Sequence, residues 1–129
     1  MRHRNQVFQM NNTIYKVLTL KEWEGASVSG LIVTDLDRKD GFVHLSTASQ
    51  LALTVELFFT QYNQLVLLQI DGAALNEGLI FEKSLSPDER PGLFPHLYRE
   101  LPISQVIKRW CIDRGAFALP KEVLLQSEE

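Results

Sequence analysis

Hydrophobic and polar residues follow one another in a pattern that predicts several short strands. Residues 13–19 are rich in β-branched and aromatic side chains, which is typical of a strand. Residues 65–70 form an almost continuous apolar run, as in a central strand covered on both faces. Shorter apolar segments predict further strands at residues 31–34, 42–45, 79–82 and 106–112. The pattern therefore predicts about six strands.

A first helix is predicted directly after the first strand. Thr19 is followed three positions later by Glu22, the spacing of a capping box that satisfies free N–H groups at a helix start. The helix should run to about residue 29, and Gly30 fits its C-terminal end. Its inward-facing residues are expected to be Leu20, Trp23 and Val28.

A second helix is predicted after residue 47 by the same signal, because Thr47 and Gln50 form another capping box. Apolar residues then recur at helical spacing, which indicates core packing rather than a cofactor site. These residues are Leu51, Val55, Phe58 and Phe59.

A charged segment at residues 35–41 separates these elements. Five of its seven residues are charged, and Asp40-Gly41 is a turn signal. We interpret the segment as a solvated surface loop. The spacing of Asp35 and Asp37 is too short for a calcium-binding loop, so no metal site is expected there.

Six strands with two main helices predict one α+β domain. The domain should span residues 13–125, after a flexible leader at 1–12 and before a frayed tail at 126–129. Turn signals at residues 83–93 predict a loop long enough to be a lid or a rim. A short docking helix is expected near residues 117–125.

Composition agrees with a single globular domain. The chain has 129 residues, of which 45% are hydrophobic and 22% charged. A net charge of −3 gives no reason to expect a general nucleic-acid or membrane surface. No segment has the roughly 20 apolar residues that a membrane span needs, and no signal peptide is evident. A single cysteine, Cys111, excludes an internal disulfide and favours the cytoplasm; it is expected to be a small buried hydrophobe.

Two histidines are the main candidates for chemistry. His44 and His96 each lie in a short apolar and aromatic segment, and histidine readily moves protons near neutral pH. The pair could act as an acid–base couple, hold a metal or bind phosphate. Metal binding is disfavoured because the i, i+4 pair of a helical zinc site is absent. The alternative, that each histidine is structural and bound to a backbone carbonyl, stays open.

Other polar residues lie beside these histidines. Ser46 and Thr47 follow His44 at a strand-to-helix junction, where free N–H groups favour anions, although both hydroxyls could simply cap the helix. Tyr98 is a candidate for lining a pocket, whereas Arg99 and Glu100 are expected on a solvated rim. The chain has no P-loop, no dinucleotide glycine fingerprint and no nucleophile elbow.

Two motifs carry a family resemblance. The sequences Gly-Phe-Val-His-Leu-Ser-Thr at 41–47 and Phe-Pro-His-Leu-Tyr at 94–98 resemble the paired hallmarks of a bacterial family of unknown function, number nine hundred fifty-two. Weaker features fall in that family's order, at residues 14–16, 23–24, 65–68, 101–102 and 106. The resemblance covers about residues 14 to 106.

That family is similar to the ADP-ribosyltransferase fold, a compact split β-structure that holds NAD between two sheets. The resemblance implies a cleft lined by His44, Ser46, His96 and Tyr98, and NAD or an ADP-ribose-like molecule as the ligand. Active transferases carry His or Arg on the first strand and a catalytic Glu on a late one. Lys16 and His96 stand nearest those two positions here.

Two functions follow as hypotheses. The first is a small or degenerate enzyme that binds a nucleotide or another phosphorylated ligand. His44 would be its acid–base group or phosphate ligand with His96 opposite, and the ligand-binding residues would be Lys16, Ser46, Thr47 and Tyr98. The second is a non-catalytic ligand-binding or protein-interaction module with structural histidines. Neither hypothesis defines a cofactor or an oligomeric state.

Overall fold

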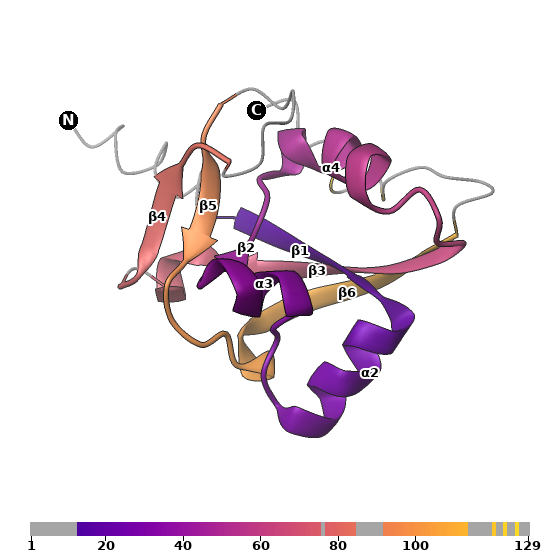
Figure 1. Cartoon of the computed structure of the whole chain (residues 1–129), viewed down its shortest axis with the longest axis horizontal. Helices are drawn as coiled ribbons and strands as arrows, with labels where there is room; N and C mark the ends of the chain where they lie inside the picture. The colour runs from indigo at the N-terminus through magenta and orange to yellow at the C-terminus, as the bar shows by residue number, and fades with distance from the viewer. Residues whose placement is uncertain are drawn as a thin grey trace.

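Six strands form two small antiparallel sheets in the computed structural model, which describes residues 13–75, 77–84, 92–113, 120, 123 and 126 (Figure 1). The first sheet has the order β1-β3-β6, and the second has the order β2-β5-β4. The strands are β1 (Thr13–Thr19), β2 (Val43–His44), β3 (Gln64–Asp71), β4 (Leu79–Glu82), β5 (Phe94–Leu97) and β6 (Val106–Asp113). The predicted α+β class with six strands is therefore confirmed.

Three α-helices accompany the sheets: α2 (Leu20–Ser29), α3 (Asp35–Asp40) and α4 (Leu51–Phe58). Short 3-10 turns occupy Ala48–Gln50, Gly72–Leu75 and Ile103–Gln105. None of the helices among the described residues is long and apolar enough to cross a membrane. The predicted leader, and most of the predicted 83–93 loop and 117–125 helix, lie outside the described residues.

The first sheet places β3 at its centre, as the apolar run predicts. Residues 65–68 are all at most 1% exposed, because both faces of β3 are covered. Alternation along β1 directs Ile14 and Leu18 into one apolar cluster and Tyr15 and Val17 into another. One packed apolar layer therefore lies on each face of this sheet.

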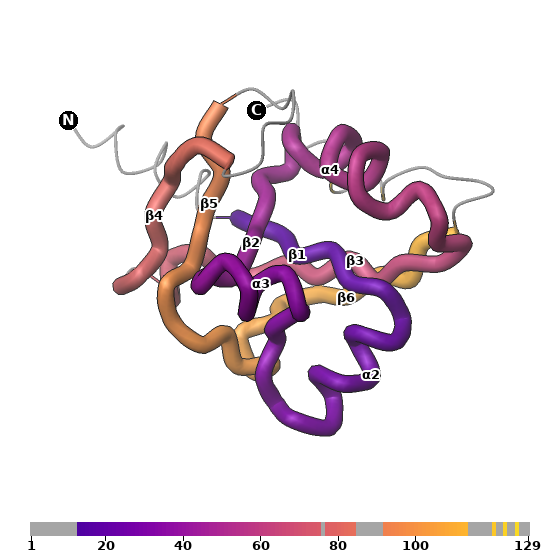
Figure 2. Tube along the Cα trace, in the orientation of Figure 1, coloured from indigo at the N-terminus to yellow at the C-terminus, as the bar shows by residue number. Residues whose placement is uncertain are grey.

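The second sheet joins the first through the chain that follows β2. Ser46 exchanges two backbone hydrogen bonds with Tyr15 of β1, at 2.8 and 2.9 Å. The trace in Figure 2 accordingly passes from β2 across β1 before it enters α4. Within the second sheet, His44 of β2 lies directly opposite His96 of β5. The segment predicted as a strand-to-helix junction is thus also the link between the sheets.

The charged segment is a helix, and the prediction of a solvated loop is wrong. Thr34 caps α3: its hydroxyl accepts from the N–H of Asp37 at 3.1 Å, and the Asp37 carboxylate accepts from the N–H of Thr34 at 2.9 Å. Gly41 ends the helix in the left-handed region, with φ of 87°. This capping box turns Asp37 inward, and the residue is only 2% exposed.

The predicted strand at residues 31–34 is also wrong. Leu31 forms only an isolated bridge with Pro102, and the N–H of Ile32 bonds to the carbonyl of Leu101. The chain turns at Thr34 to start α3, so the single bridge does not extend into a pair of strands. The sixth strand is instead β5, which carries the second family motif.

Three burial expectations need correction. In α2 the capping box and the Gly30 end are confirmed, but Leu20 and Val28 are 39% and 90% exposed, and the helix packs through Trp23 and Ala26. Phe58 of α4 is 41% exposed, whereas Leu51 and Val55 are buried as expected. Cys111 is exposed because β6 is an edge strand whose alternation buries Ile112 instead.

Two glycines, one at the end of α3 and one inside α2, offer a matched test of the helix backbone. We expect Gly41→Ala to lower the free energy of unfolding by about 1 kcal/mol, because a Cβ disfavours the positive φ of that residue. Gly25→Ala, inside α2 where an added Cβ meets no atom within 4 Å, should instead raise the free energy of unfolding by about 0.5–1 kcal/mol. Urea unfolding of both variants measures the difference. Equal effects of the same sign would contradict the assigned conformations.

Candidate functional site

Asp37 is the centre of the polar network in this fold. Its carboxylate accepts hydrogen bonds from the Lys16 ammonium at 2.9 and 3.1 Å, and from the backbone N–H of His44 at 3.0 Å. The Nδ1 atom of His44 lies 2.7 Å from the same carboxylate, and Thr34 supplies the capping bond. Lys16 also donates to the backbone carbonyl of His44 at 2.8 Å. The network therefore ties together β1, α3 and β2.

The pKa of Asp37 lies well below that of an ordinary carboxyl group. Burial acts in the opposite direction, since it disfavours the charged form. Burial is outweighed by four lowering causes together: the hydrogen bond from the His44 side chain, the charge of Lys16, and the backbone N–H groups of His44 and Thr34. Asp37 is consequently a permanent anion at neutral pH.

A pH dependence of stability follows from this lowered pKa. The contribution of Asp37 is fully present above its unfolded pKa, about 3.9, and is lost as the pH falls from there toward the folded pKa. The difference in unfolding free energy between wild type and Asp37→Asn should therefore shrink below about pH 4, by up to about 1.4 kcal/mol per pH unit. Urea titrations at pH 7, 4 and 3 measure it. A constant difference across this range would contradict a lowered pKa.

His44 lies between two carboxylates. Its Nδ1 faces Asp37 at 2.7 Å and its Nε2 faces Asp40 at 2.9 Å. Both contacts are hydrogen bonds at the same time only when the imidazole carries both protons. In the neutral ring, the shorter contact with buried Asp37 fixes the proton on Nδ1 and leaves a lone pair on Nε2. Asp37 therefore sets the tautomer, and Asp40, at 19% side-chain exposure, is the carboxylate nearer to solvent.

His96 has a different carboxylate partner. Its Nδ1 lies 2.8 Å from Glu82, and the phenol of Tyr98 donates to the same carboxylate oxygen. These hydrogen bonds, first from Tyr98 and then from His96, lower the pKa of Glu82, and the bond to Glu82 raises the pKa of Tyr98. His96 itself is 2% exposed, so Glu82 and Tyr98 connect a buried imidazole to the surface.

The two histidines are neighbours in space. Their ring centroids lie 5.7 Å apart in an edge-on arrangement, across the β2–β5 ladder. Phe42 packs against both, with its centroid 4.0 Å from that of His96 and 4.5 Å from that of His44. Each histidine contacts a carboxylate through its Nδ1 atom.

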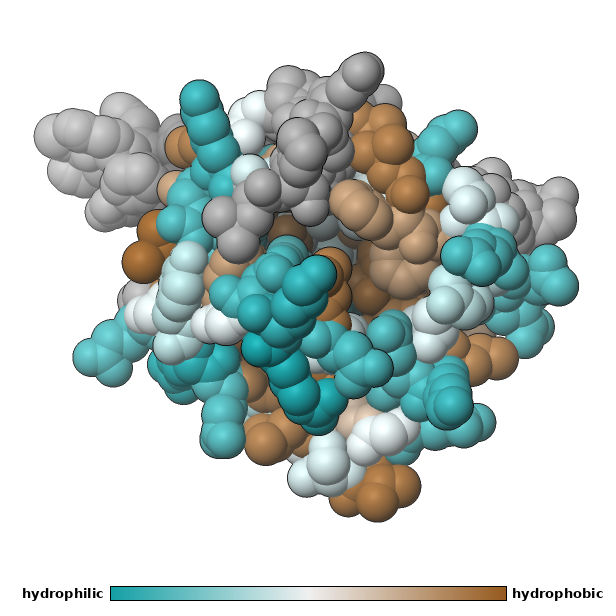
Figure 3. All heavy atoms as spheres, in the orientation of Figure 1, coloured by the Kyte–Doolittle hydropathy of each residue, from teal (hydrophilic) through white to brown (hydrophobic). Residues whose placement is uncertain are grey.

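A cavity of about 250 Å³ lies against this network. Four of the residues that the sequence singled out line it: Lys16, His44, Ser46 and His96. The Ser46 hydroxyl lies 3.3 Å from that of Thr54 on α4. Aromatic residues also line it: Tyr15, Phe58, Phe59, Tyr62 and Phe94. At the surface, Figure 3 shows hydrophilic side chains over α3 and hydrophobic ones over α4.

Two predicted ligand-binding residues lie elsewhere. Thr47 does not line the cavity; its N–H bonds to the Gln50 side chain at 2.9 Å, so this half of the expected capping box is present. Tyr98 lines a separate hollow together with Arg99 and Glu100, and is linked to His96 through Glu82. The side chains of Thr47 and Tyr98 are therefore outside the cavity.

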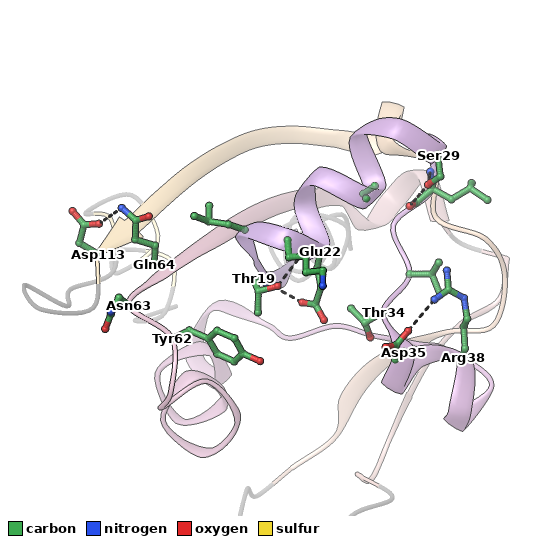
Figure 4. Close-up of a pocket in the computed structure, with 16 residues that line it drawn as sticks. Thr19, Glu22, Ser29, Thr34, Asp35, Arg38, Tyr62, Asn63, Gln64 and Asp113 are labelled. Atoms are coloured by element: carbon green, nitrogen blue, oxygen red, sulfur yellow. Dashed lines mark hydrogen bonds and ion pairs between the residues drawn. The ribbon is translucent and has the colours of Figure 1, made fainter.

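A larger groove adjoins the cavity. Thr19, Glu22, Thr34 and Tyr62 line both. In Figure 4 these residues lie in the middle of the groove, with Asp35 and Arg38 at one end and Gln64 and Asp113 at the other. Two ligand-accessible spaces thus meet at the start of α2 and of α3.

Three acidic residues of these networks were not recognised in the sequence: Asp37, Asp40 and Glu82. A signal existed for Asp37, since Thr34-x-x-Asp37 before Gly41 has the spacing of a capped short helix. Glu82 has no local signal, because its link to His96 depends on the β4–β5 register. In the part of the chain that the structure describes, no group of three or more His, Cys, Asp or Glu could hold a metal ion.

Comparisons with known proteins agree with the sequence resemblance. A family model described as "Protein of unknown function (DUF952)" matches residues 17–109. The crystal structure of protein CC0527 from Caulobacter crescentus is similar, with 34% identity, a TM-score of 0.73, and coverage of 89% of this chain and 98% of that one. The solution structure of CC0527 shares 36% identity over 79% and 85% of the two chains, with a TM-score of 0.67. The curated proteins contain no match.

Proposed function

This chain belongs to the DUF952 family of proteins of unknown function, and we propose that its cavity binds a small nucleotide-like molecule on which His44 acts as a general acid–base. One observation carries the proposal: His44 lines the cavity while buried Asp37 holds its Nδ1 at 2.7 Å. A carboxylate that orients an imidazole in this way directs the other ring nitrogen toward a reacting group.

Proton transfer at His44 requires the ligand to take the place of Asp40 at the Nε2 atom. Asp40 contacts Nε2 of His44 from the more exposed side of the ring. A ligand that displaces Asp40 meets the Nε2 atom directly, while Asp37 keeps the ring in place. Nε2 then accepts a proton from the ligand, or returns one to it, and the buried Asp37 carboxylate stabilises the imidazolium that forms.

The shape of the cavity supports a ligand with a flat ring. The lining combines aromatic side chains with a few hydrogen-bonding groups, as is usual in small-molecule sites. At about 250 Å³ it is smaller than the roughly 300–1,000 Å³ of typical ligand pockets. It would enclose one ring with short substituents, and the rest of a nucleotide would lie along the adjoining groove.

The kinship to ADP-ribosyltransferases is part of this proposal. It is supported by a cavity lined from both sheets, with Lys16 on β1 and His44 and His96 on β2 and β5. Lys16 is bound to Asp37, however, and His96 to Glu82, so these two side chains are positioning residues rather than the transferase's own catalytic pair. We therefore include NAD and ADP-ribose among the ligands to test.

Ligand binding by the wild type and by His44→Gln tests the proposal. We expect at least one of NAD, ADP-ribose, nucleosides and nucleotides to raise the melting temperature of the wild type by mass action, and His44→Gln to lose most of that shift. Thr47→Ala, outside the cavity, is the matched control and should keep the shift. Urea unfolding shows that each variant is folded. If no ligand in the panel shifts the wild type, or if His44→Gln responds like the wild type, the proposal is wrong.

A non-catalytic binding module is the second candidate. The observation in its favour is that both ring nitrogens of His44 contact carboxylates, as in a purely structural histidine. Proton NMR of the stabilising ligand, incubated with the protein, distinguishes the two. Conversion of the ligand that depends on His44 supports acid–base catalysis, whereas binding without conversion supports the module.

A further inference from the structure

The two carboxylates around the His44 ring differ in how firmly they are held. Asp37 is 2% exposed, and besides facing the ring it accepts from the Lys16 ammonium and from the backbone N–H groups of His44 and Thr34. Asp40 is half-buried, and within the described part of the chain its side chain has one hydrogen-bond partner, Nε2 of His44 at 2.9 Å. Other donors therefore keep Asp37 in place whatever the charge of the ring, whereas Asp40 depends on the ring alone.

The contact between Asp40 and Nε2 requires a proton on that nitrogen. A carboxylate only accepts, and an unprotonated ring nitrogen also only accepts, so the two atoms attract each other at 2.9 Å only when Nε2 is protonated. Nδ1 keeps its own proton, because it faces the fixed carboxylate of Asp37 at 2.7 Å. The arrangement is thus that of the imidazolium, and loss of the Nε2 proton directs a lone pair at the Asp40 carboxylate.

The end of α3 does little else to hold Asp40 against the ring. Asp40 is the last residue of the helix, where the free carbonyl groups carry partial negative charge and disfavour a carboxylate. Gly41 follows with a φ of 87°, and an added Cβ there would meet no atom within 4 Å. Asp37 is the buried residue of this six-residue helix. The Asp40 side chain can therefore leave the ring while Asp37 keeps the helix attached.

The other charged groups packed near His44 have partners of their own or lie in solvent. They are Lys16 of β1, bound to Asp37 and to the His44 carbonyl, Arg38 of α3, paired with Asp35, the exposed Lys39 of α3, His96 of β5, paired with Glu82, and Glu22 of α2, which accepts from the N–H of Thr19. Histidine is the side chain whose ordinary titration lies between pH 5 and 8. Of the two histidines in this region, His44 is the one that contacts Asp40.

We propose that the charge of His44 controls access to the candidate site, with the Asp40 side chain as the gate. In the imidazolium form Asp40 binds Nε2 and blocks that edge of the ring. When Nε2 gives its proton to water, Asp40 turns toward solvent and the lone pair becomes available to a ligand in the cavity. The inference rests on the proposed function, because this access matters only for a ligand that meets Nε2. It predicts a site that is closed in acid and open above the titration of the ring.

NMR of the ligand-free protein tests the gate between about pH 5 and 8. The signals to follow are the ring nitrogens of His44, the carboxyl carbon of Asp40 and the amide of Gly41. The wild type is compared with His44→Gln, Asp40→Asn and Asp35→Asn. Asp35→Asn is the matched control, since it removes one negative charge from the same helix at a fully exposed side chain. The wild-type titration decides the central point even where a variant fails to fold.

We expect the Asp40 carboxyl and Gly41 amide signals of the wild type to shift with the same midpoint as the His44 ring. The neutral ring should carry its proton on Nδ1. His44→Gln should abolish the shift of both signals, and Asp35→Asn should keep it. In the imidazolium form, the Nε2 proton should exchange with water on the order of tenfold faster in Asp40→Asn than in the wild type, as expected for loss of a charge-assisted hydrogen bond.

Three results would each overturn the gate. The first is Asp40 and Gly41 signals that stay constant while the His44 ring titrates. The second is a neutral ring protonated on Nε2, since Asp40 could then remain bound to it. The third is an Nε2 proton that exchanges equally fast in Asp40→Asn and in the wild type.

The absence of ligand from this experiment separates the gate from the proposed function. If Asp40 follows the charge of His44 but no ligand stabilises the protein, the gate is supported and the proposed function is wrong. If ligands stabilise the wild type through His44 while Asp40 does not follow the ring, the gate is wrong and the proposed function stands. If both experiments give the negative result, both proposals are wrong.

Discussion

Replacing Asp37 with asparagine is expected to lower the free energy of unfolding by about 3–5 kcal/mol at pH 7. The Asp37 carboxylate accepts from Lys16, from the ring and backbone of His44 and from Thr34. An asparagine keeps one acceptor oxygen and brings an NH₂ group against donors. The Lys16 ammonium, at 5% exposure, is then left without a counter-charge in the interior.

Asp35→Asn is the matched control for this substitution. Asp35 is on the same helix, its side chain is fully exposed, and its ion pair with Arg38 lies on the surface. Its loss should change the unfolding free energy by no more than about 0.5 kcal/mol. Urea unfolding of both variants gives the comparison. Effects within 1 kcal/mol of each other would mean that Asp37 is not the centre of a buried charge network.

Lys16→Met is expected to be nearly as costly as Asp37→Asn, with a loss of about 3–5 kcal/mol. Methionine fills much of the volume of the lysine stem but leaves Asp37 without the ammonium group of Lys16. The double variant Lys16→Met with Asp37→Leu removes both charges at once. It should be more stable than either single charge deletion, because no unpaired buried charge remains.

Recovery in this double variant should be partial. Asp37 also accepts from the N–H of Thr34 and caps α3, a contact worth about 1 kcal/mol, and it orients His44. We expect the double variant to stay about 1–2 kcal/mol below the wild type in urea unfolding. Lys21→Met, on the exposed surface of α2, is the control and should be close to neutral. A double variant that loses the sum of the two single effects would contradict a direct interaction between Lys16 and Asp37.

The elements that the sequence predicts well are those determined locally. The Thr19–Glu22 capping box, the Gly30 helix end and the apolar run of β3 each depend on neighbouring residues, and each is present in the structure. The shared position of His44 and His96 was inferred from two motifs rather than from periodicity. Their pairing across β2 and β5 is a consequence of register, which no local pattern contains.

The errors arise where tertiary contacts override composition. Charge density suggested solvent at residues 35–41, but the Lys16 ammonium on β1 pairs with Asp37 and makes its burial favourable. Lys16 itself occupies a strand interior that would ordinarily be apolar, and only the position of α3 explains it. Cys111 was expected to be buried, because sequence does not reveal that β6 is an edge strand. The carboxylate partners of both histidines were missed because they depend on the position of α3 and on the β4–β5 register.

The pairing of His44 with His96 also has a consequence for synthesis on the ribosome. Fifty-two positions separate the two residues, so β2 cannot find its ladder partner until β5 has left the exit tunnel. During that interval an unpaired strand edge is exposed in the nascent chain, and such edges favour association with other chains. A strand of only two residues, Val43 and His44, presents a very short edge. The brevity of β2 thus limits the risk of wrong pairing before translation is complete.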